Sequence, residues 1–188
     1  MLANPGILPK DVHLHVYFAP DSMQPTTLVR LVQTALSALL AFYTLLVAFT
    51  NLTDYGANFE FVRMVIGMSD TFSASKTWRG ITHPLAPHLF YAVVIALESA
   101  AGVLGMLGAV RMWRTRYATP ALFQKGKNLA VYGALTGLIL WFGAFVTVGG
   151  EWFLMWQSGK WNAQATAFSL SIFYGLALSI LLKHEQSL

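Results

Sequence analysis

The sequence predicts an all-α membrane protein whose four transmembrane helices form a bundle. Only 11% of its 188 residues are charged, against about 25% in an average soluble domain. Its apolar residues stand in four long blocks, at about residues 28–49, 86–110, 129–149 and 163–182. Each block can cross a hydrocarbon core roughly 30 Å thick at about 1.5 Å per residue. We therefore expect one integral membrane domain over residues 28–188.

Residues 1–27 precede the first span and form a polar arm interrupted by four prolines. His13 and His15 could place two metal ligands together, but no third ligand follows nearby. We therefore expect a loosely ordered arm and no metal site. The chain contains no cysteine, which excludes disulfides, thiolate metal sites and iron–sulfur clusters.

The first span carries a stripe of small and polar residues at helical spacing: Arg30, Gln33, Ser37, Ala41, Thr44 and Ala48. Lipid gives helices no hydrophobic drive to associate, so such residues mark the face that turns toward neighbouring helices. Residues 51–56 then predict a turn with side-chain capping. Residues 58–68 predict a short helix at the membrane interface.

Glu98 stands at the midpoint of the second span and is the most informative single residue. An acid at the bilayer centre costs roughly 2.5–3.5 kcal/mol on insertion scales, so it is a candidate functional residue. Tyr91, Gly102, Gly105 and Ala109 share its face, and we expect this side chain to point into the protein. It is either a hydrogen-bonded packing residue or an acid linked to protons or to a quinone.

The connector between the second and third spans predicts the topology. Residues 111–127 contain five basic residues and no acid, whereas the long loop of residues 51–85 has mixed charge. The positive-inside rule places the basic connector in the cytoplasm. Both termini are then cytoplasmic, and the two aromatic-rich loops, residues 51–85 and 150–162, share the outer face.

The last two spans carry further small-residue faces. The third has Gly133, Gly137, Trp141 and Ala144 along one side, and the fourth has Ser171, Gly175 and Ser179 at four-residue steps. We expect both faces to pack against neighbouring helices.

The turn of residues 149–162 joins these two spans and holds three of the six tryptophans. Trp152, Trp156 and Trp161 fit an aromatic belt at the membrane boundary. Polar side chains stand between them, and we expect these to fold back onto the first outer loop. The polar residues of the turn are Glu151, Gln157 and Asn162, with Arg79 and Arg63 as cationic partners in the loop and Asp54 and Asn58 as hydrogen-bonding ones.

The sequence of the turn also resembles that of a known protein family. Its pattern Gly-Gly-Glu-Trp-Phe-x-Met-Trp-Gln-Ser-x-x-Trp-Asn resembles the signature of a bacterial family of predicted small integral membrane proteins, domain-of-unknown-function family 2165. Three further pieces match in order: residues 51–62, residues 78–82 and Glu98. The resemblance covers residues 28–182 and implies a multi-pass protein of the bacterial inner membrane, with no implied activity. Ala163 stands where the family typically has Gly, and Ser169 where it typically has Arg.

Several function classes are disfavoured by the residues. His83 and His88 lie at the outer edge of the second span and no histidine lies deeper in any span, which argues against a b-type haem. No hydrolase motif is present, so we expect no enzymatic activity. We also expect no nucleic-acid binding, because the sequence has no basic face with interleaved aromatic residues. A transporter is weakly supported, because the chain shows no evident repeat, broken helix or second buried charge.

We therefore expect a non-catalytic membrane subunit or assembly partner of a larger complex, of a respiratory or oxidoreductase kind. Its partners would be the lipid bilayer and either other subunits or copies of itself. The alternatives are a protein that binds a quinone or lipid between Glu98 and the outer turn, and a proton-linked transport component. The candidate functional residues are Glu98, Glu151, Trp152, Trp156, Gln157, Trp161, Asn162, Asp54, Asn58 and Arg79.

Overall fold

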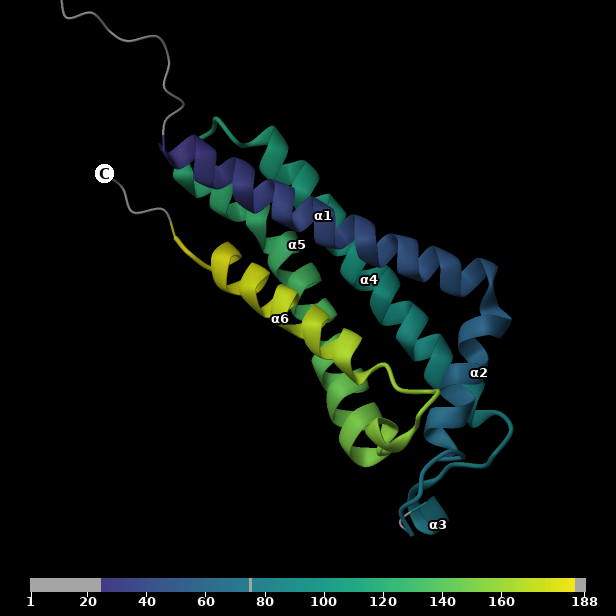
Figure 1. Ribbon diagram of the computed structural model, residues 1–188. Helices are drawn as coiled ribbons and strands as arrows, with labels where there is room; N and C mark the ends of the chain where they lie inside the picture. The colour runs from purple at the N-terminus through teal and green to yellow at the C-terminus, as the bar shows by residue number, and fades with distance from the viewer. Residues whose placement is uncertain (1–24, 75, 185–188) are drawn as a thin grey trace, which may run out of the picture.

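The computed structural model describes residues 25–74 and 76–184, and this part of the chain is helical (Figure 1). Residues 1–24 of the predicted arm (1–27), with His13 and His15, lie outside the described part, and residues 25–27 form the start of the first helix. The long elements are α1 (Pro25–Thr53), α4 (Ala86–Arg114), α5 (Pro120–Leu138) with the π-helix η1 (Ile139–Trp152) that continues it, and α6 (Gln164–Leu181). The short ones are α2 (Tyr55–Ile66), α3 (Lys76–Arg79) and the 3₁₀-helix η2 (Met155–Gln157).

Four of these segments are long and apolar enough to cross a membrane: Thr26–Thr53, Ala86–Arg114, Pro120–Trp152 and Gln164–Leu181. They run alongside one another, and many large apolar side chains on them are exposed, as suits a surface facing lipid. The prediction of an all-helical protein with four membrane-spanning helices is therefore confirmed.

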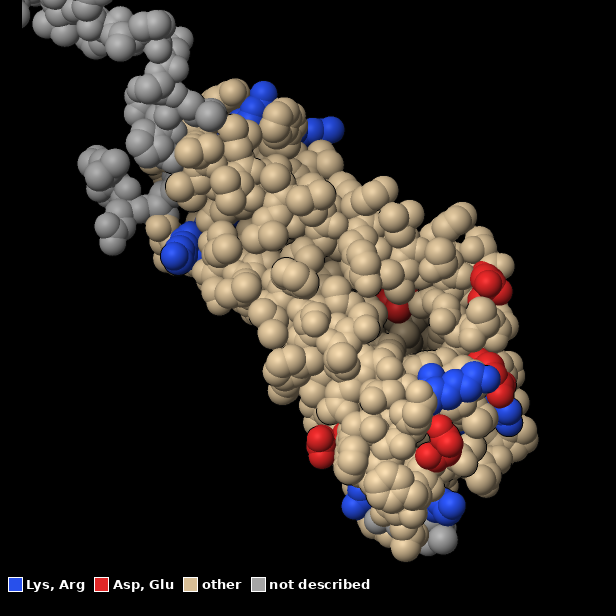
Figure 2. Space-filling model, viewed as in Figure 1, with Lys and Arg blue, Asp and Glu red and all other residues tan. Residues whose placement is uncertain are grey.

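The two ends of the bundle differ. The start of α1, the α4–α5 connection and the end of α6 lie together at what we call the basic end, whereas α2, α3 and η2 lie at the opposite loop end (Figure 1). In Figure 2 the described part shows only basic groups at the basic end and both signs of charge at the loop end. The helices lie close at the basic end and diverge toward the loop end.

The predicted stripe of α1 is entirely buried. All six of its residues have exposed fractions of 6% or less. Ser37 donates a hydrogen bond to the carbonyl of Gly105 on α4 (3.2 Å), and the Thr44 and Tyr174 hydroxyls share a short hydrogen bond between α1 and α6. The pattern of small and polar residues thus correctly identified the face that packs inside the protein.

Helices α4 and α5 cross at glycines. A Cβ atom added at Gly108 would lie 2.2 Å from the backbone nitrogen of Ala130, so the two backbones touch at this point. The predicted seam of α6 is wrong in part. Ser171 is buried, but Gly175 has no atom within 4 Å of its would-be Cβ and Ser179 is exposed. The buried face of α6 instead uses large residues such as Tyr174 and Leu181, because they fill space that small residues on α5 leave open.

Buried polar side chains close the basic end. Arg30 donates from Nη1 to the carbonyls of Arg116 and Ala118 (2.8 and 2.7 Å) just past the end of α4. Gln33 donates to Ile180 O (2.8 Å), and Lys127 donates to the carbonyl of Lys183 (2.7 Å), both at the end of α6. Carbonyls at a helix C-terminus lack intrahelical donors and carry partial negative charge, so these side chains stabilise the helix ends.

The predicted turn at residues 51–56 is wrong in its details. Helix α1 continues to Thr53, and Asp54 takes the N-cap position of α2 with no side-chain capping hydrogen bond. Asn51 does not cap a turn, because its side chain bonds across to other helices, as described below. The predicted short helix is confirmed as α2, which packs its Val62, Val65 and Ile66 into the core at the loop end.

Candidate functional site

Glu98 lies on α4 and is 1% exposed, so the predicted inward orientation is confirmed. Its Oε2 accepts a hydrogen bond of 2.7 Å from Nδ2 of Asn51 on α1. A buried carboxyl is costly unless it is hydrogen-bonded, and this amide supplies one bond.

Asn51 connects three helices at this point. Its Oδ1 accepts from Nδ2 of Asn58 on α2 (2.6 Å), while its backbone carbonyl accepts from the Tyr91 hydroxyl on α4 (3.2 Å). The amide chain Asn58–Asn51–Glu98 therefore runs from the loop end into the membrane-spanning part of the bundle. Two of the predicted site residues, Asn58 and Glu98, belong to this hydrogen-bonded chain. Asn51 was not predicted as a site residue, because its local sequence suggested that it caps a turn.

A cavity of about 210 Å³ opens beside this chain of amides. Figure 2 shows the molecule hollowed midway along its length, with acidic surface inside the hollow. The lining contains no Lys, Arg or His, so no cation neutralises the acid there. The lining residues come from α1, α2, α4, η1 and the start of the last span: Val47, Thr50, Asn51, Asn58, Phe61, Val62, Tyr91, Val94, Glu98, Trp141, Phe145 and Ala163.

Trp141 lines this cavity and carries a hydrogen-bond donor that is not used. The residue is 6% exposed, and its Nε1–H is buried with no acceptor among the described residues. Most buried polar groups in proteins are hydrogen-bonded, so a buried donor without an acceptor calls for an explanation. The sequence marked Trp141 only as part of a packing face.

The second half of the third span is a π-helix of 14 residues, η1. π-helices are rare and occur mostly as single-turn bulges, frequently at functional sites. The wider winding is visible in the bonds: Thr147 Oγ1 donates to the carbonyl of Phe142 and Phe153 N–H to that of Val148, five residues back in each case (2.9 and 3.0 Å). Trp141 and Phe145 both lie on η1 and line the cavity.

A second, apolar cavity of about 220 Å³ adjoins the first, toward the loop end. The two share four lining residues, Phe61, Val62, Val94 and Phe145. The Phe61 and Phe145 rings are stacked with centroids 6.4 Å apart and form part of the wall between the cavities. A polar compartment and an apolar compartment thus stand side by side.

The turn after η1 contacts the first long loop at the loop end. The Ser158 hydroxyl donates to Asp70 Oδ2 (2.6 Å), and the Gln157 side chain accepts from the backbone N–H of Ser73 (3.2 Å). Arg79 Nη1 donates to the carbonyl of Trp152 (3.3 Å). Of the expected loop partners, Arg79 therefore contacts the turn. Within the described part of the chain, the Asp54 side chain makes no hydrogen bond to the turn, and Asn58 bonds to Asn51 instead.

The other predicted turn residues lie apart from the Glu98 cavity. Trp156 packs edge-on against Phe72 and Trp161 against Phe61, while Asn162 accepts from the backbone N–H of Gln164 at the start of α6. Glu151 is exposed and lines a separate surface cavity with Arg79. No residue of the turn lines the cavity beside Glu98, but Ala163, directly after the turn, does.

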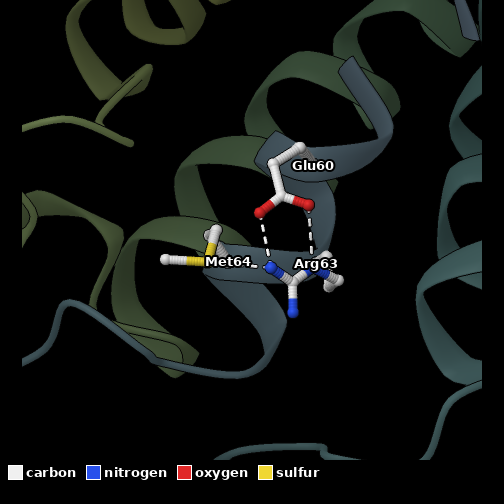
Figure 3. A network of polar contacts seen from close by, with 3 residues as sticks. All are labelled: Glu60, Arg63 and Met64. Atoms are coloured by element: carbon white, nitrogen blue, oxygen red, sulfur yellow. Dashed lines mark hydrogen bonds and ion pairs between the residues drawn. The ribbon is translucent and has the colours of Figure 1, made fainter. Parts of the chain in front are cut away.

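Arg63 pairs with Glu60 on its own helix rather than with the turn (Figure 3). Its Nε and Nη2 donate to the two carboxylate oxygens at 2.8 and 2.5 Å. Hydrogen bonding to Arg63 holds the pKa of Glu60 below its ordinary value, with a smaller contribution from the charge of Lys160. Both side chains are exposed, so this is a surface pair of α2. The suggestion that Arg63 serves the turn is therefore wrong.

The model of the family described as predicted small integral membrane protein (DUF2165) matches residues 29–184. The chain belongs to this family. The match confirms the resemblance carried by the turn, by residues 51–62 and 78–82 and by Glu98. A search of curated proteins and a search of solved structures each found no match.

Proposed function

We propose that this integral membrane protein binds a small lipophilic molecule from the bilayer in the cavity beside Glu98. The observation that supports this most is the buried carboxyl of Glu98, with one described hydrogen bond, in the wall of a cavity that Trp141 also lines. The Nε1–H of Trp141 is buried beside it without a described acceptor. Packing alone accounts for neither a polar cavity at this depth nor an unused donor, because both are costly away from water.

The side chains define what the molecule must offer. It needs a polar atom that bonds to Glu98, which accepts when ionised and donates when protonated. An oxygen of the ligand can also accept from Trp141, once the ligand displaces the side chains that cover the buried Nε1. The ligand also needs an apolar part that fits beside Phe61 and Phe145, where the adjoining apolar cavity can take a tail. A quinone and a lipid ester group both meet these requirements.

Purification and analysis of co-purified small molecules test this proposal. Tagged protein is isolated in a mild detergent, extracted with organic solvent and analysed by mass spectrometry, with the ligand quantified per mole of protein. We expect one lipophilic species at near-stoichiometric amounts. Because a hydrogen bond contributes about 0.5–1.5 kcal/mol, Trp141→Phe should weaken retention by roughly two- to tenfold.

Trp113→Phe is the matched control, since Trp113 is half-exposed at the basic end and does not line this cavity. It should retain the ligand as the wild type does. Equal retention by all variants, or no bound lipophilic molecule in the wild type, would contradict the proposal.

A non-catalytic role as a subunit or assembly partner is a second proposal. Four aromatic side chains at the loop end support it, because they are 47–75% exposed: Phe72, Trp78, Trp152 and Trp156. Exposed aromatic residues are the types that anchor protein interfaces, although they also suit a membrane boundary. The same purification tests this role: a stoichiometric partner protein should be present, and replacing Trp156 with Ala should release it.

A further inference from the structure

A third cavity, of about 540 Å³, lies at the loop end and is distinct from the site beside Glu98. It lies between the beginning of α4, the end of η1 and the segment that follows α3, and it shares no lining residue with the Glu98 cavity. Phe90 and Val148 give it apolar walls, while Arg79 and Glu151 bring one charge of each sign.

Arg79 is held in place but keeps unused hydrogen-bonding capacity. Its guanidinium lies 4.8 Å from the ring centroid of Trp78 and 5.3 Å from that of Trp152, and it makes one long bond to the Trp152 carbonyl. Its Nη2 donates to no acceptor among the described residues and is available to a ligand, whereas its Nε is buried. An arginine whose plane is fixed by aromatic rings is well suited to bidentate contact with a phosphate.

Glu151 supplies the opposite charge on the same cavity. It is exposed, and no described side chain donates to its carboxylate or pairs with it. A ligand carrying only negative charge would meet repulsion from Glu151, and one carrying only positive charge would meet repulsion from Arg79. The cavity therefore suits a ligand that carries both charges a short distance apart.

We propose that this cavity binds the headgroup of a zwitterionic phospholipid with a primary ammonium group, phosphatidylethanolamine. The phosphate lies on Arg79, the ammonium lies on Glu151, and the acyl chains descend along Phe90 and Val148. The position of the cavity supports a bilayer lipid as the source, since it stands where a membrane-spanning segment ends and is flanked by exposed tryptophans of the kind found at headgroup level. The headgroup contacts of this site are separate from the cavity beside Glu98, but its acyl chains pack against Phe90, Val148 and Phe153, which also line the adjoining apolar cavity.

Native mass spectrometry with defined lipids tests the site. The purified full-length protein is titrated with phosphatidylethanolamine, phosphatidylcholine and phosphatidylglycerol that carry the same acyl chains. Wild type should bind phosphatidylethanolamine best, because a primary ammonium donates hydrogen bonds that a quaternary one cannot. Loss of a charge-assisted hydrogen bond corresponds to about tenfold or more, so Arg79→Gln should weaken phosphatidylethanolamine binding by about this factor.

Glu151→Lys gives the sharper test, because it should reverse the preference toward anionic phosphatidylglycerol. Lys76→Gln, on the same short helix as Arg79, is the control for a general loss of positive charge and should leave the preference unchanged. The Glu151 and Lys76 side chains are both exposed, so Glu151→Lys and Lys76→Gln should fold as the wild type does. Thermal unfolding in detergent checks this. No preference among the three lipids, or equal effects of Lys76→Gln and Arg79→Gln, would overturn the proposal.

Discussion

The hydrogen bond between Asn51 and Glu98 should couple α1 to α4 energetically. Replacing Asn51 with Leu removes the 2.7 Å bond to a carboxyl that is 1% exposed. Leaving such a buried group short of a partner costs about 1–3 kcal/mol, whereas hydrogen bonds between membrane helices average about 0.6 kcal/mol. We therefore expect Asn51→Leu to destabilise the protein by about 2 kcal/mol.

The same variant also releases Asn58, but that residue is exposed and water can satisfy its amide. Asn58→Ala should accordingly cost only about 0.5 kcal/mol, at the low end for a hydrogen bond. Asn128→Ala, an exposed asparagine on α5, is the matched control and should have no measurable effect.

A double-mutant cycle isolates the pair. Replacing both residues with leucine leaves neither polar group buried without a partner. The double variant Asn51→Leu with Glu98→Leu should therefore lose about 1–2 kcal/mol less unfolding free energy than the two single variants lose together. The free energy of unfolding is measured by titrating the protein from mild detergent into sodium dodecyl sulfate, with helicity followed by circular dichroism. If the two changes add to within about 0.5 kcal/mol, the two residues are not coupled and the reasoning fails.

Three other features give direct predictions. Gly108→Ala should destabilise by about 1–3 kcal/mol, because its Cβ would lie 2.2 Å from the α5 backbone, whereas Gly175→Ala, with nothing within 4 Å, should be neutral or stabilising in the same titration. In intact cells, a cysteine placed at exposed Gly159 should react with an impermeant thiol reagent from outside, and one at exposed Thr119 should not; the reverse would overturn the predicted topology. Hydrogen bonding to Arg63 lowers the pKa of Glu60, so the ionised carboxylate stabilises the folded protein at neutral pH. Glu60→Gln should therefore be less stable than the wild type at neutral pH, and this difference should vanish as the pH falls through the lowered pKa. A stability difference that persists in acid would contradict this.

The sequence predicted those features that the membrane itself imposes. The stripe on α1 was recognised because lipid penalises exposed polar groups and so sorts one face of a helix from the other. Glu98 was recognised for the same reason, since an acid at mid-span has few alternatives to burial. These inferences need only the helical period and the knowledge that lipid surrounds the helices. Both can be inferred from a single sequence.

The partners of these residues were not predictable in the same way. Asn51 stands 47 positions before Glu98 and in a stretch whose composition favours a turn, so only the tertiary packing shows that its amide bonds to α4. The sequence did not predict the π-helix, because residues 139–152 contain no proline and resemble an ordinary apolar span. Trp141 was therefore placed on the right helix but without its role in a cavity wall.

The distribution of polar contacts explains why both proposed sites belong to the loop half of the bundle. At the basic end, Arg30, Gln33 and Lys127 donate to carbonyls at helix ends, and the helices lie close together. Toward the loop end the helices diverge, and not every polar group is used in packing: among the described residues, Trp141 keeps an unused donor and Glu151 an unpaired carboxylate. A cavity of about 320 Å³ also lies between α1 and α4 at the basic end, but its lining is apolar apart from Thr34 and Arg114. The polar groups without described partners that could orient a ligand therefore lie between the middle of the bundle and the loop end.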